Sequence, residues 1–166
     1  MTLLAVDVGY STRGAKAAGV EFDDWSAAEP VKSWTSVTGE VEAYIPGEFY
    51  KRELPCILQL LSDLQLQPDC IVVDGFVYLD GSSKPGLGKH LFNALAGAIP
   101  IIGVAKTAYV GIPHRFQVIR GKSKRPLFVT SEGIGVEAAK ALVRSMHGSH
   151  RIPTLLKIAD RLSHTC

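Results

Sequence analysis

Two short apolar runs that each lead into an aspartate constrain this chain more than any other feature. Residues 3–6 (LLAV) precede Asp7, and residues 70–73 (CIVV) precede Asp74. Runs of this length and composition predict buried β-strands. Because aspartate is a poor strand residue and is costly to bury without a partner, we expect both carboxylates to point into a crevice where their strands leave the core.

This crevice is a candidate metal site. Carboxylates on neighbouring strands repel each other unless a cation or a shared proton relieves them, and carboxylates with water are the usual ligands of Mg²⁺. Glu53 and Asp160, both on predicted helices, can add further carboxylates, and Lys106 at the end of the run IIGVA can hold a phosphate oxygen. The set suits metal-assisted phosphodiester hydrolysis. Taken singly, however, a strand-end Asp is more often a turn former or helix cap, and such a lysine is more often solvated.

The order of the predicted elements indicates an α/β domain. The first strand and strands over 15–22 and 31–37 form an expected antiparallel meander, followed by a helix over 48–64 that Pro55 should kink or interrupt. The later predicted elements are strands over 70–74, 100–104, 116–119 and 126–130 and helices over 87–96, 136–146 and 153–162. We therefore expect one domain over residues 1–166, with a mixed β-sheet flanked by helices.

Composition and charge narrow the class of protein. No apolar run approaches the roughly 20 residues that span a bilayer, and the three scattered cysteines indicate neither a disulfide framework nor a zinc site. We expect a cytoplasmic protein with no membrane association. Residues 1–80 hold 5 Lys and Arg against 13 Asp and Glu (net −8), and residues 81–166 hold 13 against 3 (net +10). The split predicts a cation-attracting and an anion-attracting region, or two halves that attract each other in the fold.

Seven blocks occur in the order in which they appear in one known family. They are AVDVGY (5–10), YIPGEFYKRELP (44–55), IVVDG (71–75), GLGKH (86–90), IGVAK (102–106), RPLFVT (125–130) and HRIPTLLKIAD (150–160). With them the chain resembles endonuclease V, a nuclease of the ribonuclease H-like superfamily that acts on deaminated purines. The resemblance implies a ribonuclease H-like mixed sheet, in which a three-stranded antiparallel meander is followed by parallel strands.

The resemblance also implies an activity and its residues. Asp7, Glu53, Asp74 and Lys106 would be catalytic, and Asp7, Asp74, Glu53 and Asp160 would hold Mg²⁺, for which Mn²⁺ can substitute. The implied reaction is hydrolysis of the second phosphodiester on the 3′ side of hypoxanthine in DNA, as a step in DNA repair. RNA is an open alternative substrate. The implied protein is a monomer, with no protein partner predicted.

Further positions match parts of the family that contact nucleic acid. The wedge loop that fills the gap left by a flipped nucleotide is matched by Tyr44, Ile45, Pro46 and Gly47. The glycine-lined pocket for the extruded base is matched by Gly75, Gly86 and Leu87. Candidate phosphate contacts, each equally readable as part of a solvated charged face, are Lys84, Lys89, Lys122, Lys124 and Arg125.

Two departures from the family keep alternatives open. Asp80 stands about where the family carries a histidine near the metal, where it can still orient a metal-bound water, and Ser131 and Glu132 replace the family's Gly-His. The chain is therefore a nuclease for inosine, a nucleic-acid-binding relative with weak or lost hydrolysis, or a nuclease for another DNA structure.

Overall fold

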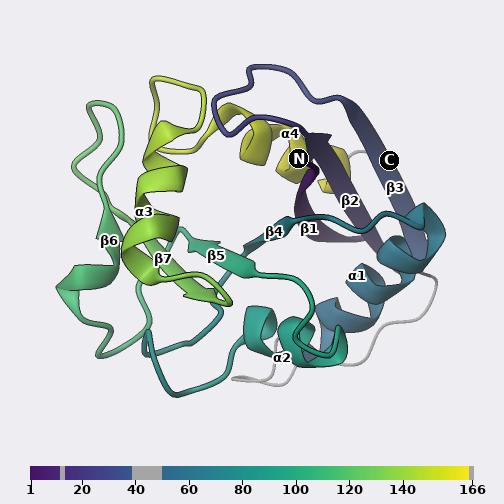
Figure 1. The fold of residues 1–166 in the computed structure, drawn as a ribbon, viewed down its shortest axis with the longest axis horizontal. Helices are drawn as coiled ribbons and strands as arrows, with labels where there is room; N and C mark the ends of the chain where they lie inside the picture. The colour runs from purple at the N-terminus through teal and green to yellow at the C-terminus, as the bar shows by residue number, and fades with distance from the viewer. Residues whose placement is uncertain (12–13, 39–49, 165–166) are drawn as a thin grey trace.

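A seven-stranded mixed β-sheet forms the centre of the protein, with strand order β3-β2-β1-β4-β5-β7-β6 (Figure 1). The computed structural model describes residues 1–11, 14–38 and 50–164. The strands are β1 (Leu3–Ser11), β2 (Gly14–Phe22), β3 (Lys32–Thr38), β4 (Cys70–Asp74), β5 (Ile101–Ala105), β6 (Gln117–Val118) and β7 (Leu127–Glu132). The helices are α1 (Tyr50–Leu64), α2 (Leu87–Ala94), α3 (Val136–Ser145) and α4 (Thr154–His164), with a 3₁₀ turn at His114–Phe116.

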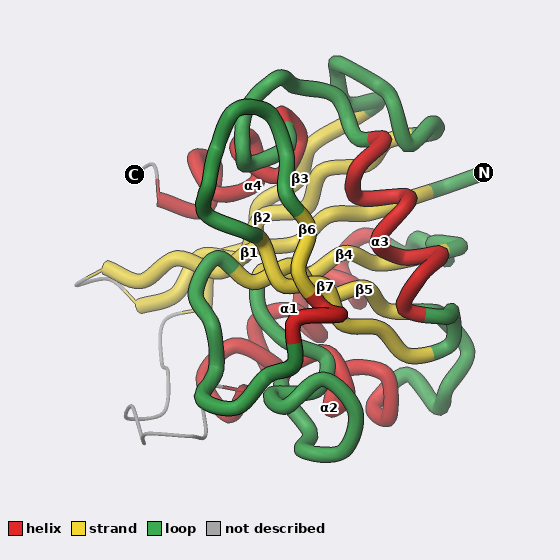
Figure 2. Tube along the Cα trace, turned by 90° about the vertical axis from the view of Figure 1, so that its left-hand side faces the viewer, coloured by secondary structure: helices red, strands yellow, loops and turns green. Residues whose placement is uncertain are grey.

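The sheet topology confirms the expected fold class. Strands β1, β2 and β3 form an antiparallel meander, and β4 and β5 then add to β1 in parallel. Strands β7 and β6 close the far edge in antiparallel orientation. Figure 2 shows α1 and α2 on one side of the sheet and α3 and α4 on the other.

The two faces of the sheet bury separate halves of the core. Alternate residues of the strands pack beneath α3 and α4, among them Leu3, Ala5, Cys70, Val72, Ile102 and Val104. The intervening residues, among them Leu4, Val6, Ile71 and Val73, pack against α1 and α2. Because side chains alternate along a strand with a period of about two residues, these assignments also fix where Asp7 and Asp74 point: toward α4.

The first strand is longer than predicted. We expected it to end over residues 7–9, but the hairpin with β2 continues to the pair Ser11 and Gly14, so Asp7 lies inside β1. The parallel pairing with β4 ends at Val6 and Val73. Asp7 therefore lies level with the end of β4, its parallel neighbour. Its own strand, β1, continues further because its antiparallel partner β2 also extends beyond that point.

Of the turn or kink expected at Pro55, the turn is absent, because helix α1 continues through this residue. A proline inside a helix removes one backbone hydrogen bond. Pro55 is exposed, so the gap faces solvent, while Cys56, Ile57 and Leu60 bury the other side of the helix. Among the described residues, each helix is too short or too polar to cross a bilayer.

Candidate active site

Asp7 and Asp74 lie side by side at the carboxyl edge of the parallel strands. They directly follow Val6 and Val73, the last residues that β1 and β4 pair with each other. Asp7 is 8% exposed and accepts a hydrogen bond of 2.8 Å from the N–H of Val8, whereas Asp74 is exposed. Burial, followed by the negative charge of Asp74, raises the pKa of Asp7 to about 8. The structure thus brings together the two carboxylates that the sequence predicted to meet.

Helix α4 adds a third carboxylate from above the sheet. Asp160 lies close enough to Asp7 that its charge contributes to the raised pKa of Asp7. The ammonium of Lys106 lies 3.7 Å from Asp74 Oδ2 and 4.0 Å from Asp160 Oδ1. Lys106 directly follows β5, which pairs with β4 through Asp74 and Val104. One cation therefore stands between carboxylates from two separate elements.

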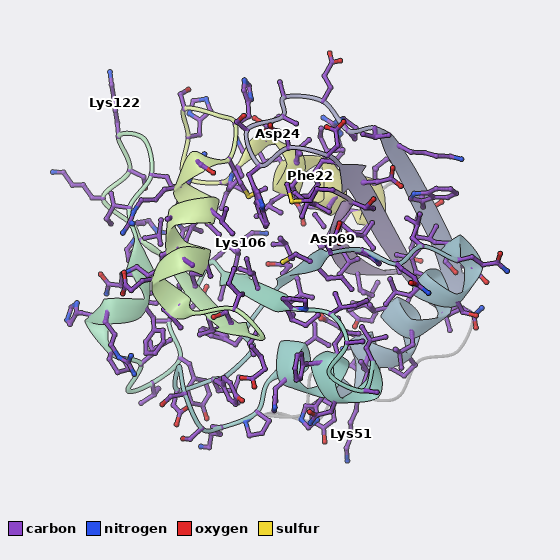
Figure 3. The ribbon with its side chains drawn as sticks, viewed as in Figure 1. Phe22, Asp24, Lys51, Asp69, Lys106 and Lys122 are labelled. Atoms are coloured by element: carbon purple, nitrogen blue, oxygen red, sulfur yellow. The ribbon has the colours of Figure 1, made fainter. Side chains whose placement is uncertain are left out.

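A small cavity of about 20 Å³, enough for about one water molecule, lies between β1, β4 and α4. Its lining is apolar except for Asp7, Asp74 and Lys106. Figure 3 shows Lys106 near the middle of the view. The lining residues are Val6, Asp7, Val73, Asp74, Val104, Lys106, Ile152, Leu156 and Ala159.

Glu53 approaches the same edge from the opposite face. It lies in the first turn of α1 and is half-buried. Burial, followed by the charge of Asp74, raises the pKa of Glu53 to about 7, while Arg52 opposes the shift. Asp74 therefore influences both Asp7 and Glu53, and the four predicted acids belong to one electrostatic cluster.

The carboxylate oxygens of this cluster are ligands that suit a hard divalent cation. Asp7 and Glu53 are desolvated by burial, and both lie near the negative charge of Asp74, which is the condition that a bound cation relieves. In the described residues, no three Asp, Glu, His or Cys side chains stand together as a ready-made metal site. Instead the carboxylates meet in pairs, and the Lys106 ammonium supplies the positive charge between two of them.

Asp80 lies in a different environment from these acids. It accepts hydrogen bonds from the hydroxyl of Ser83 and from the backbone N–H groups of Ser82, Ser83 and Lys84. Those bonds, first of all the one from the Ser83 hydroxyl, lower the pKa of Asp80. The carboxylate thus stabilises its own loop, and this structure does not bring it to the acidic cluster.

The glycines of the expected base pocket differ in what they contact. Gly75 follows β4 with φ +136°, and among the described residues no atom beyond its chain neighbours lies within 4 Å of where its Cβ would be. A Cβ on Gly86 would lie 2.6 Å from the carbonyl oxygen of Phe76, and Leu87 is a buried core residue. Of the three, Gly75 leaves open space beside the acids, while Gly86 and Leu87 serve the packing of the adjacent loop.

The candidate phosphate contacts also separate into two groups. Lys89 pairs with Glu132 at 3.5 Å, and Lys84 donates a hydrogen bond of 3.3 Å to the hydroxyl of Tyr109. Lys122, Lys124 and Arg125 are exposed on the connection from β6 to β7. The wedge residues Tyr44, Ile45, Pro46 and Gly47 lie outside the described residues.

Two residues that the sequence reasoning did not assign contact this site. The guanidinium of Arg151 donates a hydrogen bond to the backbone carbonyl of Lys106. His164 Nδ1 lies 3.4 Å from Asp160 Oδ1, four residues away on α4. The block HRIPTLLKIAD contains Arg151, but nothing in its spacing indicates a contact with residue 106.

Comparison with known proteins agrees with this geometry. Residues 1–125 match the sequence model of the family described as Endonuclease V. The Endonuclease V of Azotobacter vinelandii is 30% identical, over 97% of this chain and 81% of that protein. That of Nostoc punctiforme is 32% identical, over 95% of this chain and 80% of that protein.

Solved structures give the same result for the fold. The crystal structure of the Endonuclease V from Streptomyces avermitilis has a TM-score of 0.76 and 29% identity, covering 98% of this chain and 79% of that chain. Endonuclease V of Ciona intestinalis, in complex with a 23mer DNA containing an inosine followed by a ribo-adenosine, has a TM-score of 0.80. Its identity is 21%, covering 98% of this chain and 83% of that chain. The fold is ribonuclease H-like, and the chain belongs to the endonuclease V family of nucleases.

Proposed function

We propose that this protein is a Mg²⁺-dependent endonuclease that recognises hypoxanthine in DNA and hydrolyses the second phosphodiester on the 3′ side of the lesion, in DNA repair. The observation that carries the proposal is that Asp74 and Asp160 both pair with the ammonium of Lys106 while Asp7 lies beside these two carboxylates. The DNA of the Ciona intestinalis complex contains an inosine, which supports this choice of substrate.

In this proposal Asp7, Asp74, Asp160 and Glu53 hold the divalent ion through carboxylate oxygens. When bound, the ion lowers the pKa of a water molecule and stabilises the negative charge that grows on the phosphate. Lys106 binds a non-bridging oxygen of the scissile phosphate as a point charge. The water oxygen bonds to phosphorus and the O3′–phosphorus bond breaks, leaving a 3′-hydroxyl and a 5′-phosphate.

Glu53 is suited to hold the ion. In the metal-free protein, burial and then the charge of Asp74 raise the pKa of Glu53 to about 7, and a cation bound by this carboxylate would favour its charged form. The extruded base is placed against the backbone at Gly75, where open space supports close approach of a ligand. The wedge at Tyr44, Ile45, Pro46 and Gly47 fills the gap left in the duplex.

A nicking assay tests the proposal. A 5′-labelled duplex with one deoxyinosine is incubated with Mg²⁺ beside a duplex with adenine at that position and an inosine-containing RNA. Wild type is expected to cut the deoxyinosine strand one nucleotide beyond the phosphate next to the lesion. Asp74→Asn is expected to lose at least about 100-fold in rate, whereas Asp24→Asn, which removes an exposed carboxylate between β2 and β3, keeps the wild-type rate. Equal cutting by wild type and Asp74→Asn would contradict the mechanism.

A second candidate function is inosine-specific binding with weak or lost hydrolysis. The observation that favours it is Asp80, whose carboxylate is held in its own loop where the family has a histidine near the metal. Specific binding of the deoxyinosine duplex without scission, with either Mg²⁺ or Mn²⁺, would select this alternative over the nuclease.

A further inference from the structure

A second pocket lies between the β6–β7 connection and the loop that joins α3 to α4. Its volume is about 320 Å³, within the range of ligand sites, and its lining is polar and basic. The lining residues are Lys122, Ser123, Ser149, His150 and Arg151. Ser149, His150 and Arg151 were not among the candidate site residues.

The walls of this basic pocket are held by the fold. Arg120, only 5% exposed, donates hydrogen bonds to the carbonyls of Met146, Gly148 and His150 at 2.6, 3.1 and 2.7 Å. A Cβ on Gly121, where φ is +61°, would lie 2.2 Å from the carbonyl oxygen of Ser149. The two loops therefore touch backbone to backbone and are joined by a buried guanidinium.

The pocket has positive charge without a matching carboxylate. From residue 107 to residue 159 the chain has nine Lys and Arg but only two acids, Glu132 and Glu137. Glu132 pairs with Lys89, and Glu137 pairs with Lys140. In the described part of the chain, no ion pair joins a carboxylate to a cation of the pocket. Burial, and then the charge of Arg125, lower the pKa of Arg151, which is consistent with two guanidinium groups close together.

Arg151 connects the basic pocket to the active site. Its Nη2 donates hydrogen bonds to the carbonyls of Lys106 and, at 2.9 Å, Pro126. An anion in the pocket would thus be one side chain away from the backbone of the active-site lysine. In Figure 3, Lys122 extends outward from the tip of the β6–β7 connection, and it is one of the residues that line the pocket.

We propose that this pocket seats one backbone phosphate of the nucleic-acid strand whose scissile phosphate lies at Lys106. This inference rests on the proposed nuclease function and adds a defined phosphate subsite to it. The pocket would recognise a phosphate group, which a nucleic-acid strand and a free phosphate or mononucleotide both carry. The strand is favoured because the pocket adjoins the site where a neighbouring phosphate would react.

The first test compares two lysines on the same connection. Lys122 lines the pocket, whereas Lys124, two residues further along, does not. Affinity for a labelled deoxyinosine duplex is measured by fluorescence anisotropy over a series of salt concentrations, without divalent metal so that no strand is cut. Lys122→Gln is expected to reduce the slope of log affinity against log salt by about one, and Lys124→Gln by less than half of that. Equal changes in the two variants would overturn the subsite in favour of a diffuse basic face.

The second test places a negative charge in the pocket. Ser149→Asp and Ser145→Asp change the net charge equally, and both side chains are exposed, but only residue 149 lines the pocket. Ser149→Asp is expected to weaken duplex binding at least about tenfold more than Ser145→Asp at the same salt concentration. Thermal unfolding of both variants establishes that they fold. Equal weakening by the two folded variants would overturn the proposal.

A third arm separates the sources of phosphate and the two proposals. Inorganic phosphate is expected to compete with the duplex no better than chloride at equal ionic strength, because the pocket selects a strand. Stronger competition by phosphate that Ser149→Asp abolishes would show that the pocket binds free phosphate, and would overturn the proposal. A duplex that binds with the Lys122-dependent slope but is not cut with Mg²⁺ would retain the subsite and remove the nuclease. Cutting with Mg²⁺, together with equal salt slopes for Lys122→Gln and Lys124→Gln, would support the nuclease and overturn the subsite.

Discussion

Arg151 holds the backbone of Lys106, although 45 residues separate them in the chain. The same nitrogen donates to the carbonyl of Pro126, and Nε donates to that of Arg125 at 3.1 Å. These bonds join the loop before α4 to the end of β5 and the start of β7. The position of the Lys106 backbone therefore depends on the hydrogen bonds of one guanidinium.

Arg151→Lys keeps the charge but loses this fork, because one ammonium cannot bridge three carbonyls in fixed geometry. We expect kcat on the deoxyinosine duplex to fall about ten- to a hundredfold, with a smaller change in KM. The free energy of unfolding should fall by roughly 1–3 kcal/mol. Arg144→Lys, on the exposed side of α3, is the matched control. An unchanged kcat in the folded Arg151→Lys protein would refute this positioning role.

Asp7 makes stability depend on pH in the absence of metal. Its pKa rises from an ordinary 3.8 to about 8 on folding, so the native state binds the proton more tightly than the unfolded state. Its contribution to stability is complete below about pH 4, declines as the pH rises toward 8 and is absent above that. Chemical unfolding of metal-free wild type at pH 5 and pH 8 should show lower stability at pH 8.

Asp7→Asn should remove much of that dependence, because an amide carries no charge to desolvate. At pH 8 without metal, we expect the variant to be more stable than wild type by roughly 1–3 kcal/mol. Asp63→Asn, on the exposed side of α1, should leave the pH profile as in wild type. Identical profiles for Asp7→Asn and wild type would show that Asp7 is not the group responsible.

Gly103→Ala should damage the loop that carries Gly75. The added Cβ would lie 2.6 Å from the carbonyl oxygen of Gly75 and 2.8 Å from the nitrogen of Val77, and backbone atoms there cannot yield cheaply. We expect a loss of roughly 1–3 kcal/mol in unfolding free energy, together with weaker discrimination between inosine and adenine. Gly135→Ala, where no atom of the described residues other than its chain neighbours lies within 4 Å of the added Cβ, should cost less than about 1 kcal/mol. Equal destabilisation by the two substitutions would contradict the packing argument.

The sequence predicted the order of the elements and the meeting of the acids, because apolar runs and their alternation report burial directly. It misplaced the end of β1, since the length of that strand is set by its pairing with β2 through Ser11 and Gly14. It also left open a turn at Pro55, but α1 continues through this residue because the burial of one helix face outweighs one lost hydrogen bond.

The contacts of single side chains were less accessible from the sequence. The bond from Arg151 to Lys106 depends on how two loops far apart in the chain pack, and no local spacing encodes it. Asp80 was placed near the metal by its position in a motif, but the turn over residues 80–84 directs its carboxylate into its own loop.

Metal binding by the acidic cluster tests the central claim most directly. Calorimetric titration of Mn²⁺ into metal-free protein at pH 8, without nucleic acid, should show saturable binding to wild type that Asp74→Asn weakens at least about tenfold. Asp24→Asn should bind as wild type does. Failure of wild type to bind, or equal affinities for wild type and Asp74→Asn, would contradict the account.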